Sequence, residues 1–316
     1  MQPKFTTSKP VPAKTDERPR TYTLGQSTIT VSRPAGGLYL VATPIGNLGD
    51  ITLRALETLA GCDVIACEDS RVTRKLIDRF LISTPLTPYH EHNAQAARPK
   101  LLQRLSEGAA IALVSDAGTP LISDPGFKLV REVAAAGFAI TPLPGPSAVL
   151  AALTVAGLPT DRFYFDGFLP PKAGARRTRL KELATIDATL ILFEGGSRIA
   201  DALADLADVM GDREGAVCRE LTKLHEDVRR APLRQLAVDA ERLETRGEFV
   251  IVVAPPAAGA GQLSAEDVDD LLKGAMKTQS LKDAVAHAVE LSGRPKREVY
   301  ARALELAKQD GGDEED

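Results

Sequence analysis

Cysteine is scarce in this chain, and its scarcity excludes two kinds of site. The 316 residues include three cysteines, Cys62, Cys67 and Cys218, and no Cys-x-x-Cys pair. A disulfide framework and a cysteine-based zinc site both need paired spacings, so both lose support. We therefore expect free, reduced thiols and a cytoplasmic protein.

Long apolar runs and an excess of positive charge are also absent. The first residues lack the apolar core of a signal peptide, and no segment approaches the roughly 18 uninterrupted apolar residues that cross a bilayer. Lys and Arg number 39 against 43 Asp and Glu, which gives a net charge of -4. Any contact with nucleic acid must then come from a local basic patch. Because 44% of the residues are hydrophobic, the chain can build real cores.

Two common ligand signatures are missing as well. The loop Pro44 to Gly49 is neither Gly-x-Gly-x-x-Gly nor a Walker loop, so binding of a dinucleotide or a nucleoside triphosphate loses support. His90 and His92 lie one residue apart without a later Cys or His partner, which makes a weak metal site. We expect no bound metal.

The residues that are present alternate between strand and helix patterns. Short apolar runs, typical of buried strands, are separated by segments with helical spacing of apolar residues. The predicted strands are Leu38–Ala42, Val64–Cys67, Ile111–Val114 and Phe138–Pro142, followed by Arg162–Asp166, Thr189–Phe193, Ala216–Arg219, His225–Arg229 and Phe249–Val253. This alternation predicts an α/β fold with a mainly parallel, doubly wound sheet, and then a second α/β domain.

Composition divides the chain into six segments. Residues 1 to 36, rich in Lys, Thr, Pro and Ser, are predicted to be a disordered leader. An N-terminal α/β domain over 37–158 and a C-terminal α/β domain over 159–254 follow. Residues 255–263 read as a Pro, Gly and Ala linker, 264–308 as a small domain of three amphipathic helices, and 309–316 as an acidic tail.

The strongest chemical signal runs from Leu113 to Gly126. Its apolar run ends abruptly and is followed by Asp116, Gly118, Thr119 and Pro120. Loops at the carboxyl ends of strands in α/β sheets commonly bind the ligand. A carboxylate here can accept from a ribose hydroxyl or an ammonium, and glycine lets backbone approach a ligand. Asp124 with Pro125 is typical of a helix cap. Similar Gly, Pro and Ser loops follow other strands and suit a ligand without phosphates, such as S-adenosylmethionine.

A basic segment begins shortly after the break at Gly167 to Pro171. It carries five basic residues and no acid, at Lys172, Arg176, Arg177, Arg179 and Lys181. Such a run is either a solvated helix face or a surface that binds a polyanion. Its position at the mouth of the expected cleft favours the second interpretation.

Several sequence blocks occur together in one order: Thr43-Pro44-Ile45-Gly46-Asn47-Leu48, Glu68-Asp69-Ser70-Arg71, Ser115-Asp116-Ala117-Gly118-Thr119-Pro120, Pro144-Gly145-Pro146, Gly167-Phe168-Leu169-Pro170 and Arg219-Glu220-Leu221-Thr222-Lys223. With these blocks, residues 37 to about 253 resemble the ribosomal RNA small subunit methyltransferase I family of the tetrapyrrole methylase superfamily. The C-terminal helices resemble that family's small helical domain. One departure is Glu194-Gly195-Gly196-Ser197-Arg198, where the family more usually has Glu-Ser-x-x-Arg.

The resemblance implies a fold, a reaction and a set of binding residues. The fold is that of class III, tetrapyrrole-methylase-like methyltransferases, two α/β domains with S-adenosylmethionine in the cleft between them, usually as a homodimer. The reaction is 2'-O-methylation of the ribose of cytidine 1402 of 16S rRNA, in the decoding centre of the 30S subunit. The implied donor-binding residues are Pro44, Ile45, Gly46, Asp116, Gly118, Thr119, Pro120, Ser147, Ala148, Phe193, Leu221 and Thr222.

The RNA-binding and catalytic residues are predicted from charge and chemistry. We expect RNA contacts from Arg71, Arg74, Lys172, Arg176, Arg177 and Arg179. In-line methyl transfer gains most from alignment, and a positioned base adds about 10² to 10⁴ in rate. Glu68 and Asp69 are the base candidates in the first domain, with Glu194 or Glu220 in the second. The competing interpretations are a helix cap for Asp69 and an ion pair with Arg71 or Arg74 for Glu68.

Two other functions fit parts of the sequence. One is a methyltransferase of the same fold that acts on a small molecule, a tetrapyrrole. The other is a non-catalytic ribosome-assembly factor that uses the fold to bind RNA. The basic segment and the helical domain favour a polyanionic substrate over a tetrapyrrole, and the intact ligand loops disfavour a non-catalytic role.

Overall fold

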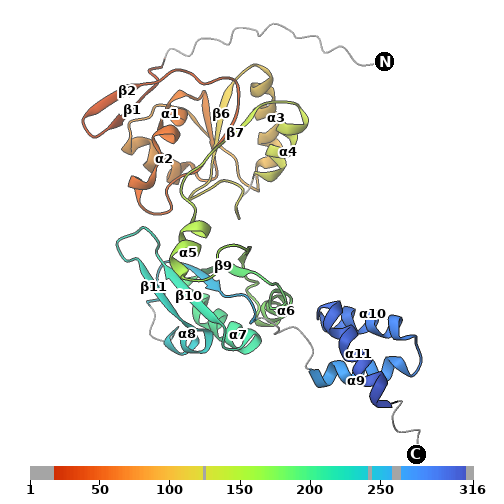
Figure 1. The fold of residues 1–316 in the computed structure, drawn as a ribbon. Helices are drawn as coiled ribbons and strands as arrows, with labels where there is room; N and C mark the ends of the chain where they lie inside the picture. The colour runs from red at the N-terminus through yellow and green to blue at the C-terminus, as the bar shows by residue number, and fades with distance from the viewer. Residues whose placement is uncertain (1–17, 124–125, 241–243, 258–264, 311–316) are drawn as a thin grey trace, which may run out of the picture.

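The computed structural model describes residues 18–123, 126–240, 244–257 and 265–310. Figure 1 shows two α/β domains in chain order, followed by three helices at the C-terminal end. Within the described ranges, no helix has both the length and the apolar character needed to cross a membrane.

The first domain has a five-stranded parallel sheet in the order β5-β4-β6-β3-β7. Helices α1 and α2 pack on one face of this sheet, and α3 and α4 pack on the other. The prediction of a parallel, doubly wound sheet is confirmed for this domain. The elements are β3 (Gly37–Val41), η1 (Leu48–Asp50), α1 (Leu53–Gly61), β4 (Val64–Cys67), α2 (Ser70–Arg79), β5 (Leu86–Pro88), α3 (Ala94–Ser106), β6 (Ala110–Val114), α4 (Phe127–Ala135) and β7 (Ile140–Leu143).

Polar caps set where the helices beside the ligand edge begin. Thr52 accepts a hydrogen bond from the Ala55 N–H at the start of α1, and Asp69 accepts one from the Arg71 N–H at the start of α2. Such caps satisfy backbone donors that lack a partner within the helix. The loops that precede these helices are therefore held at the carboxyl ends of the parallel strands, where ligands of such sheets bind.

The N-terminal segment differs from its prediction. Residues 1–17 lie outside the described part, but β1 (Thr21–Leu24) and β2 (Ser27–Thr30) form an antiparallel hairpin. Tyr22 is buried among residues of α1 and α2, and Arg20 and Arg33 both bind the Asp63 carboxylate, at 2.8 and 2.7 Å. The expectation of a disordered leader is wrong for residues 18–36, because these anchors are contacts with a distant segment.

The second domain has a mixed sheet in the order β11-β10-β12-β9-β8, so a mainly parallel arrangement does not extend to it. Only β8 and β9 are parallel, and the other neighbouring strands in this order are antiparallel. The elements are β8 (Phe163–Phe168), α6 (Ala173–Leu183), β9 (Thr189–Gly195), η2 (Gly196–Arg198), α7 (Ile199–Met210), β10 (Glu214–Arg219), β11 (Asp227–Pro232), α8 (Leu233–Asp239) and β12 (Glu248–Val253). Strand β5 and helix α8 were not predicted.

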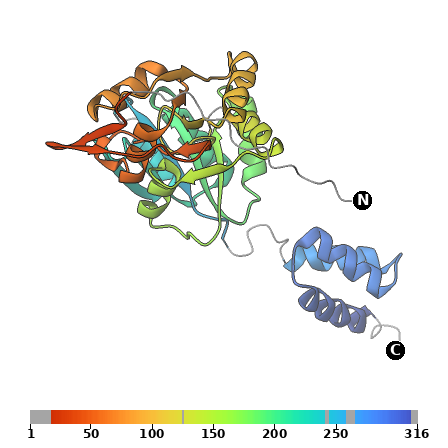
Figure 2. The same ribbon diagram turned by 90° about the horizontal axis from the view of Figure 1, so that it is seen from above.

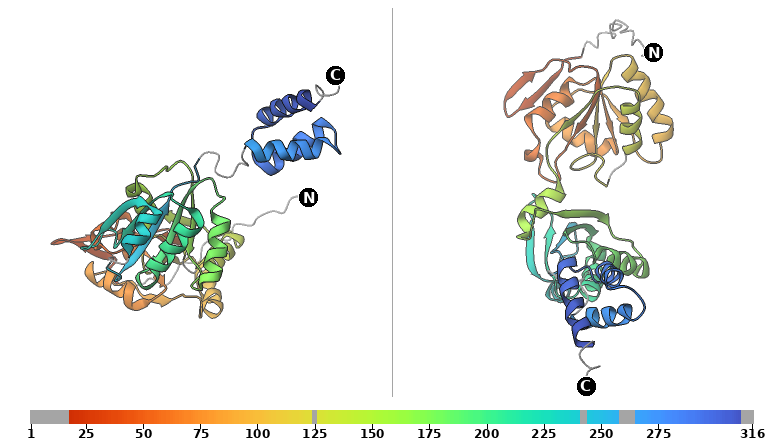
Figure 3. Two further views of the ribbon diagram at one scale, coloured as in Figure 1. Left: turned by 90° about the horizontal axis from the view of Figure 1, so that it is seen from below. Right: turned by 45° about the vertical axis from the view of Figure 1, so that its right-hand side comes forward.

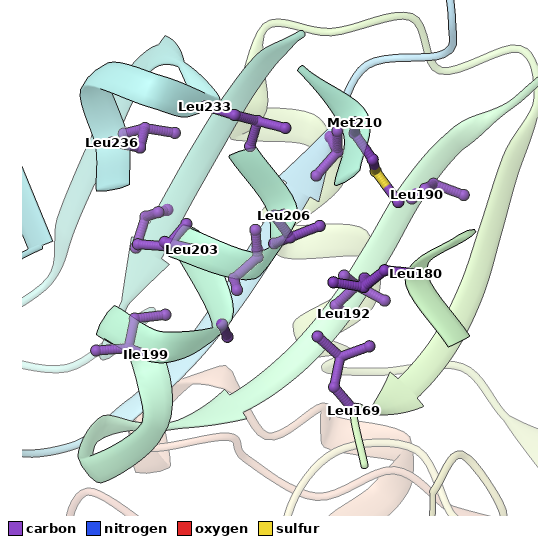
Figure 4. Packing of buried hydrophobic residues seen from close by; sticks show 14 of the residues in the cluster. Leu169, Leu180, Leu190, Leu192, Ile199, Leu203, Leu206, Met210, Leu233 and Leu236 are labelled. Carbon is purple, nitrogen blue, oxygen red and sulfur yellow. The ribbon is translucent and has the colours of Figure 1, made fainter. Parts of the chain in front are cut away.

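Two cores cover the faces of this second sheet. Helices α6, α7 and α8 pack on one face, and Figure 4 shows Leu180 of α6 and Leu206 of α7 in the same cluster as Leu192 of β9. On the other face lies α5 (Ala148–Ala156), with Val149 and Leu153 among residues of β9, β10 and β12. Helix α5 follows β7 in sequence but packs on the second sheet, so the change of domain comes before the expected residue 158.

The C-terminal helices form a core of their own. They are α9 (Ala265–Met276), α10 (Leu281–Ser292) and α11 (Lys296–Asp310), at the predicted position. The buried residues of this apolar cluster are Val268, Leu272, Val285, Ala288, Val299, Ala303 and Leu306. Figure 2 and the left view of Figure 3 show this group apart from the two sheets. Residues 258–264 of the expected linker and 311–316 of the expected tail lie outside the described ranges.

Candidate functional site

A cavity of about 510 Å³ lies between the two α/β domains. The first domain contributes Ile45 after β3, Glu68 after β4 and the loop after β6. The second contributes the start of α5, the ends of β8, β9 and β10 and the start of β12. The volume is within the range of about 300 to 1,000 Å³ that is usual for small-ligand sites. The site is therefore formed by both sheets together.

The loop after β6 is a firmly held wall of this cavity. Thr43 and Gly118 exchange two backbone hydrogen bonds of 2.9 Å, and the Thr119 hydroxyl donates to the Pro146 carbonyl at 3.1 Å. Gly118 has a φ of +77°, and Leu121 and Ser123 have positive φ values of 76° and 62°. Strained backbone of this kind persists only where its surroundings fix it, and it is concentrated at ligand sites. The predicted cap at Asp124 and Pro125 lies outside the described residues.

The structure brings most of the predicted donor-binding residues together. Eight of them line the 510 Å³ cavity: Ile45, Asp116, Gly118, Thr119, Ser147, Ala148, Phe193 and Leu221. Pro44 and Gly46 line an adjoining cavity of about 430 Å³. Pro120 and Thr222, both within the described chain, are not among the residues that line either cavity.

An aromatic group forms the second-domain side of the cavity. The Phe193 ring lies edge-on to Phe165 and Phe168, with centroid separations of 4.8 and 5.6 Å. Phe168 also lines the cavity although 57% of its surface is exposed. Phe168 was not among the predicted donor-binding residues, although it belongs to the Gly167-Phe168-Leu169-Pro170 block. An aromatic face suits an apolar ring in a ligand.

Glu68 lines the cavity and has no ion-pair partner among the described residues, and Asp116 shares this property but accepts a hydrogen bond from the Asp69 N–H. Glu68 lies at the end of β4, and none of the described residues forms a hydrogen bond or ion pair with its side chain. Burial raises the pKa of Glu68, and the nearby Asp116 carboxylate raises it further. A carboxylate with a raised pKa and a free lone pair can take up a proton.

Asp69 has a different environment from its neighbour. Its carboxylate caps α2 through the Arg71 N–H at 2.8 Å and forms a 2.6 Å ion pair with the Arg71 side chain. The hydrogen bond from the Arg71 side chain lowers the pKa of Asp69 to about 2. Asp69 does not line the cavity, while its backbone N–H donates to Asp116 at 2.9 Å. The capping interpretation therefore describes Asp69, which makes it a poor base.

Glu194 and Glu220 line the cavity, but both bind cations. Glu194 is 2% exposed and pairs with Arg198 at 2.6 Å, while its second carboxylate oxygen has no partner among the described residues. Lys223 donates to Glu220 at 2.7 Å. Burial acts to raise the pKa of Glu220, but the Lys223 hydrogen bond and the Glu248 N–H hold it below its usual value.

The arginines of α6 do not carry the free positive charge that the sequence suggests, although Lys181 is exposed and has no ion-pair partner among the described residues. Arg176 is 3% exposed and binds Asp205 at 2.6 Å, so the prediction that it contacts RNA is wrong. Arg177 binds the same carboxylate at 2.5 Å, and Arg179 binds Asp166 and Glu182. Lys172 remains exposed before the helix, and Arg71 and Arg74 are exposed on α2.

The cysteines and histidines add no further chemistry to the cavity. All three cysteines are free, as predicted. They are also buried, and burial raises the pKa of Cys218 in the cavity wall to about 11. That thiol stays protonated near neutral pH. Among the described residues, no three His, Cys, Asp or Glu side chains are grouped to hold a metal ion.

The fold and the interdomain cavity define a class, the tetrapyrrole methylases. Residues 37–237 match the family model described as Tetrapyrrole (Corrin/Porphyrin) Methylases, and residues 262–307 match the RsmI C-terminal HTH domain. Within this class, the chain belongs to the ribosomal RNA small subunit methyltransferase I family, and it is a methyltransferase.

Two curated relatives support this membership. Ribosomal RNA small subunit methyltransferase I of Mesorhizobium japonicum is 48% identical over 290 residues, which cover 91% of this chain and 98% of that protein. The protein of the same name from Pseudomonas aeruginosa is 45% identical and covers 86% of this chain and 98% of its own length.

Solved structures support the fold alone. A cobalt precorrin-4 methyltransferase of cobalamin biosynthesis superposes with a TM-score of 0.52 at 20% identity, covering 69% of this chain and 94% of its own. A diphthine synthase superposes with a TM-score of 0.54 at 17% identity, covering 69% of this chain and 89% of its own.

Proposed function

We propose that this protein transfers a methyl group from S-adenosylmethionine to the ribose 2'-oxygen of cytidine 1402 in 16S rRNA of the small ribosomal subunit. The observation that carries the substrate class is the 48% identity, over almost the whole length, to a relative named for small subunit rRNA methylation. By resemblance to that family, the proposal includes a homodimer that acts in the cytoplasm on the 30S subunit.

The residues of the 510 Å³ cavity fit the methyl donor. Its wall includes the Phe193 ring, which offers an apolar surface to the donor, and Gly118, where the donor can approach the backbone closely because there is no side chain. Glu194 keeps a buried oxygen without a partner among the described residues, which suits a hydrogen-bond donor on the ligand. S-adenosylmethionine supplies a sulfonium methyl group, whose carbon–sulfur bond breaks as the ribose oxygen bonds to that carbon. Asp116 and Glu68 supply negative charge beside this cation.

Glu68 is the residue that we propose as the general base. It lines the cavity, its carboxylate is not committed to a cation, and its raised pKa strengthens it as a base. Asp69, Glu194 and Glu220 each have an arginine or lysine partner, and Asp116 already accepts a hydrogen bond from the Asp69 N–H at 2.9 Å. Glu68 would accept the 2'-hydroxyl proton as the oxygen attacks and then release it to water.

The test compares three acceptors under identical conditions. Purified protein with labelled S-adenosylmethionine is given assembled 30S particles, naked 16S rRNA or a tetrapyrrole. The expected result is incorporation into the small subunit RNA and none into the tetrapyrrole. Label in the tetrapyrrole alone, or donor binding without transfer to any RNA, would contradict the proposal.

A further inference from the structure

Beside the proposed donor site lies a second cavity that the reaction described above does not use. It has a volume of about 430 Å³ and lies between the loop after β3, the start of α2 and the loop after β6. Five residues line both cavities: Ile45, Asp116, Ala117, Lys223 and Glu248. The two cavities therefore have a common wall, where a group held in one can reach a group held in the other.

We propose that this second cavity receives the target nucleotide of an RNA and that the exposed basic residues of α2 hold the adjoining phosphates. The inference rests on the proposed function and names the acceptor site within it. In-line transfer needs donor and acceptor on opposite sides of the transferred carbon. Two cavities that meet at Asp116 supply that arrangement, and Glu68 lines the first of them, within electrostatic reach of Asp116.

The charges on α2 suit a polyanion. Arg71, Arg74, Lys75 and Arg79 share the helix with one acid, Asp78. Lys75 lines the second cavity, and neither Arg74 nor Lys75 has an ion-pair partner among the described residues. Arg71 pairs with Asp69, yet 88% of its side chain stays exposed. In contrast, the three arginines of α6 are bound to Asp205 and Asp166. Lys and Arg side chains that are not already bound to an acid are available to contact phosphates. We therefore expect these contacts from α2 and not from the arginines of α6.

The apolar residues at this cavity suit a nucleobase. Leu48 and Val72 line the cavity with 40% and 36% of their surfaces exposed. RNA-modifying enzymes act on single-stranded or extruded nucleotides, whose bases are held against apolar or aromatic side chains. Leu48 and Val72 then contact the base while Lys75 and Arg74 contact the phosphates. Asp116 and Glu248, the acids that line this cavity, then face the ribose of the bound nucleotide and not its phosphates.

The role of the α2 charges is tested with two matched double variants. The measured quantity is binding to 30S particles, so the result does not depend on catalysis. R74A/K75A removes one Arg and one Lys from α2, and K100A/R104A removes the same charges from exposed positions of α3, on the opposite face of the sheet. Each lost phosphate contact lowers the slope of log affinity against log salt by about 0.7 to 0.9. For R74A/K75A, the slope of log affinity for 30S particles against log salt should be smaller than the parent's by about 1.4 to 1.8. For K100A/R104A, this slope should equal the parent's.

The cavity test fills the space with a larger side chain. V72W narrows the second cavity, and V238W makes the same change at an exposed position of α8, where 67% of the valine surface is accessible. V72W should lose at least tenfold in kcat/KM for 30S particles and keep the parent's affinity for S-adenosylmethionine. V238W should behave as the parent.

Equal salt slopes for the two double variants, or equal kcat/KM for the two tryptophan variants, would overturn the acceptor site. A parent that binds 30S particles but does not methylate them would instead contradict the proposed function. In that case the salt slopes still decide whether α2 contacts the RNA.

Discussion

At the scale of single residues, Gly118 offers a sharp test of where the donor binds. An added Cβ would lie 3.3 Å from Ile45 Cγ2 in the cavity wall, and the φ of +77° disfavours any side chain. Gly137 has nearly the same φ, +76°, with no atom within 4 Å of an added Cβ. A left-handed conformation costs a non-glycine residue about 1 to 2 kcal/mol. G137V therefore reproduces the backbone strain of G118V without filling the cavity.

We expect G118V to lose at least tenfold in affinity for S-adenosylmethionine, measured by titration calorimetry, and G137V to bind as the parent does. Both should lose similar amounts of unfolding free energy. If the folded G118V protein binds the donor like G137V, the donor is not held against this loop.

Glu68 predicts how the rate depends on pH. A base must be ionised to act, and the pKa of Glu68 is raised above the ordinary value of 4.5 by burial and by Asp116. The rate constant kcat/KM should therefore increase with pH and level off, with its midpoint above 4.5. E68Q should lower kcat by about 10² to 10⁴ and abolish this rise. An unchanged pH profile in E68Q would assign the proton to another group.

At the scale of elements, the N-terminal hairpin depends on Asp63. Burial acts to raise the pKa of Asp63, but hydrogen bonds from Arg33, the Ala110 N–H and Arg20 lower it from 3.8 to about 2. A folded-state pKa below the unfolded value means stability that is present above about pH 4 and is lost as the pH falls toward 2. The difference between the folded-state and unfolded-state pKa of Asp63 contributes about 2 kcal/mol to the free energy of unfolding near neutral pH.

D63N should therefore lower the unfolding free energy by about 2 kcal/mol near neutral pH and by about half as much at pH 3. Denaturant titration at both pH values measures this. D78N, at an exposed position of α2, is the control and should differ little from the parent. Equal stability of D63N and D78N would mean that the arginines of residues 18–36 do not hold the hairpin.

Helix α6 is attached to α7 through a buried ion pair. Arg176 and Asp205 each have 4% of their side chain exposed, and removal of one partner of such a pair costs about 3 to 5 kcal/mol. R176A should lose less than this, because Arg177 still binds the Asp205 carboxylate, but more than R177A, whose side chain is 55% exposed and which should lose about 1 kcal/mol or less. Under conditions where R176A stays folded, its 30S binding should keep the parent's salt slope. A reduced slope would restore α6 as an RNA contact.

The elements also show which structures the sequence could predict. Local patterns located most helices, such as α4 at Phe127–Ala135, because apolar spacing and end signals lie within the element itself. Tyr22 and Arg33 gave no local signal for the hairpin, because their partners are α1 and Asp63. The pairing of Arg176 was hidden for the same reason, since Asp205 lies on the next helix.

At the scale of the whole molecule, the cavity depends on how α5 is placed. Ser147 and Ala148 line the 510 Å³ cavity at the start of this helix, while Val149 and Leu153 pack on the second sheet. The sequence predicted the helix, and the family resemblance placed Ser147 and Ala148 at the site, but the helix was assigned to the first domain. Strand order cannot be obtained from strand patterns alone, so the mixed second sheet was also missed. The motifs predicted eight residues that line the 510 Å³ cavity, and their arrangement in space required the tertiary structure.

The central claim is that methyl transfer in this cavity modifies one ribose of the small subunit RNA. Its most direct test is to react the protein with labelled S-adenosylmethionine and 30S particles, digest the RNA to nucleosides and map the labelled position. The account predicts labelled 2'-O-methylcytidine at position 1402, present with the parent protein and lost with G118V. Label on a base, at another nucleotide or undiminished in G118V would contradict it.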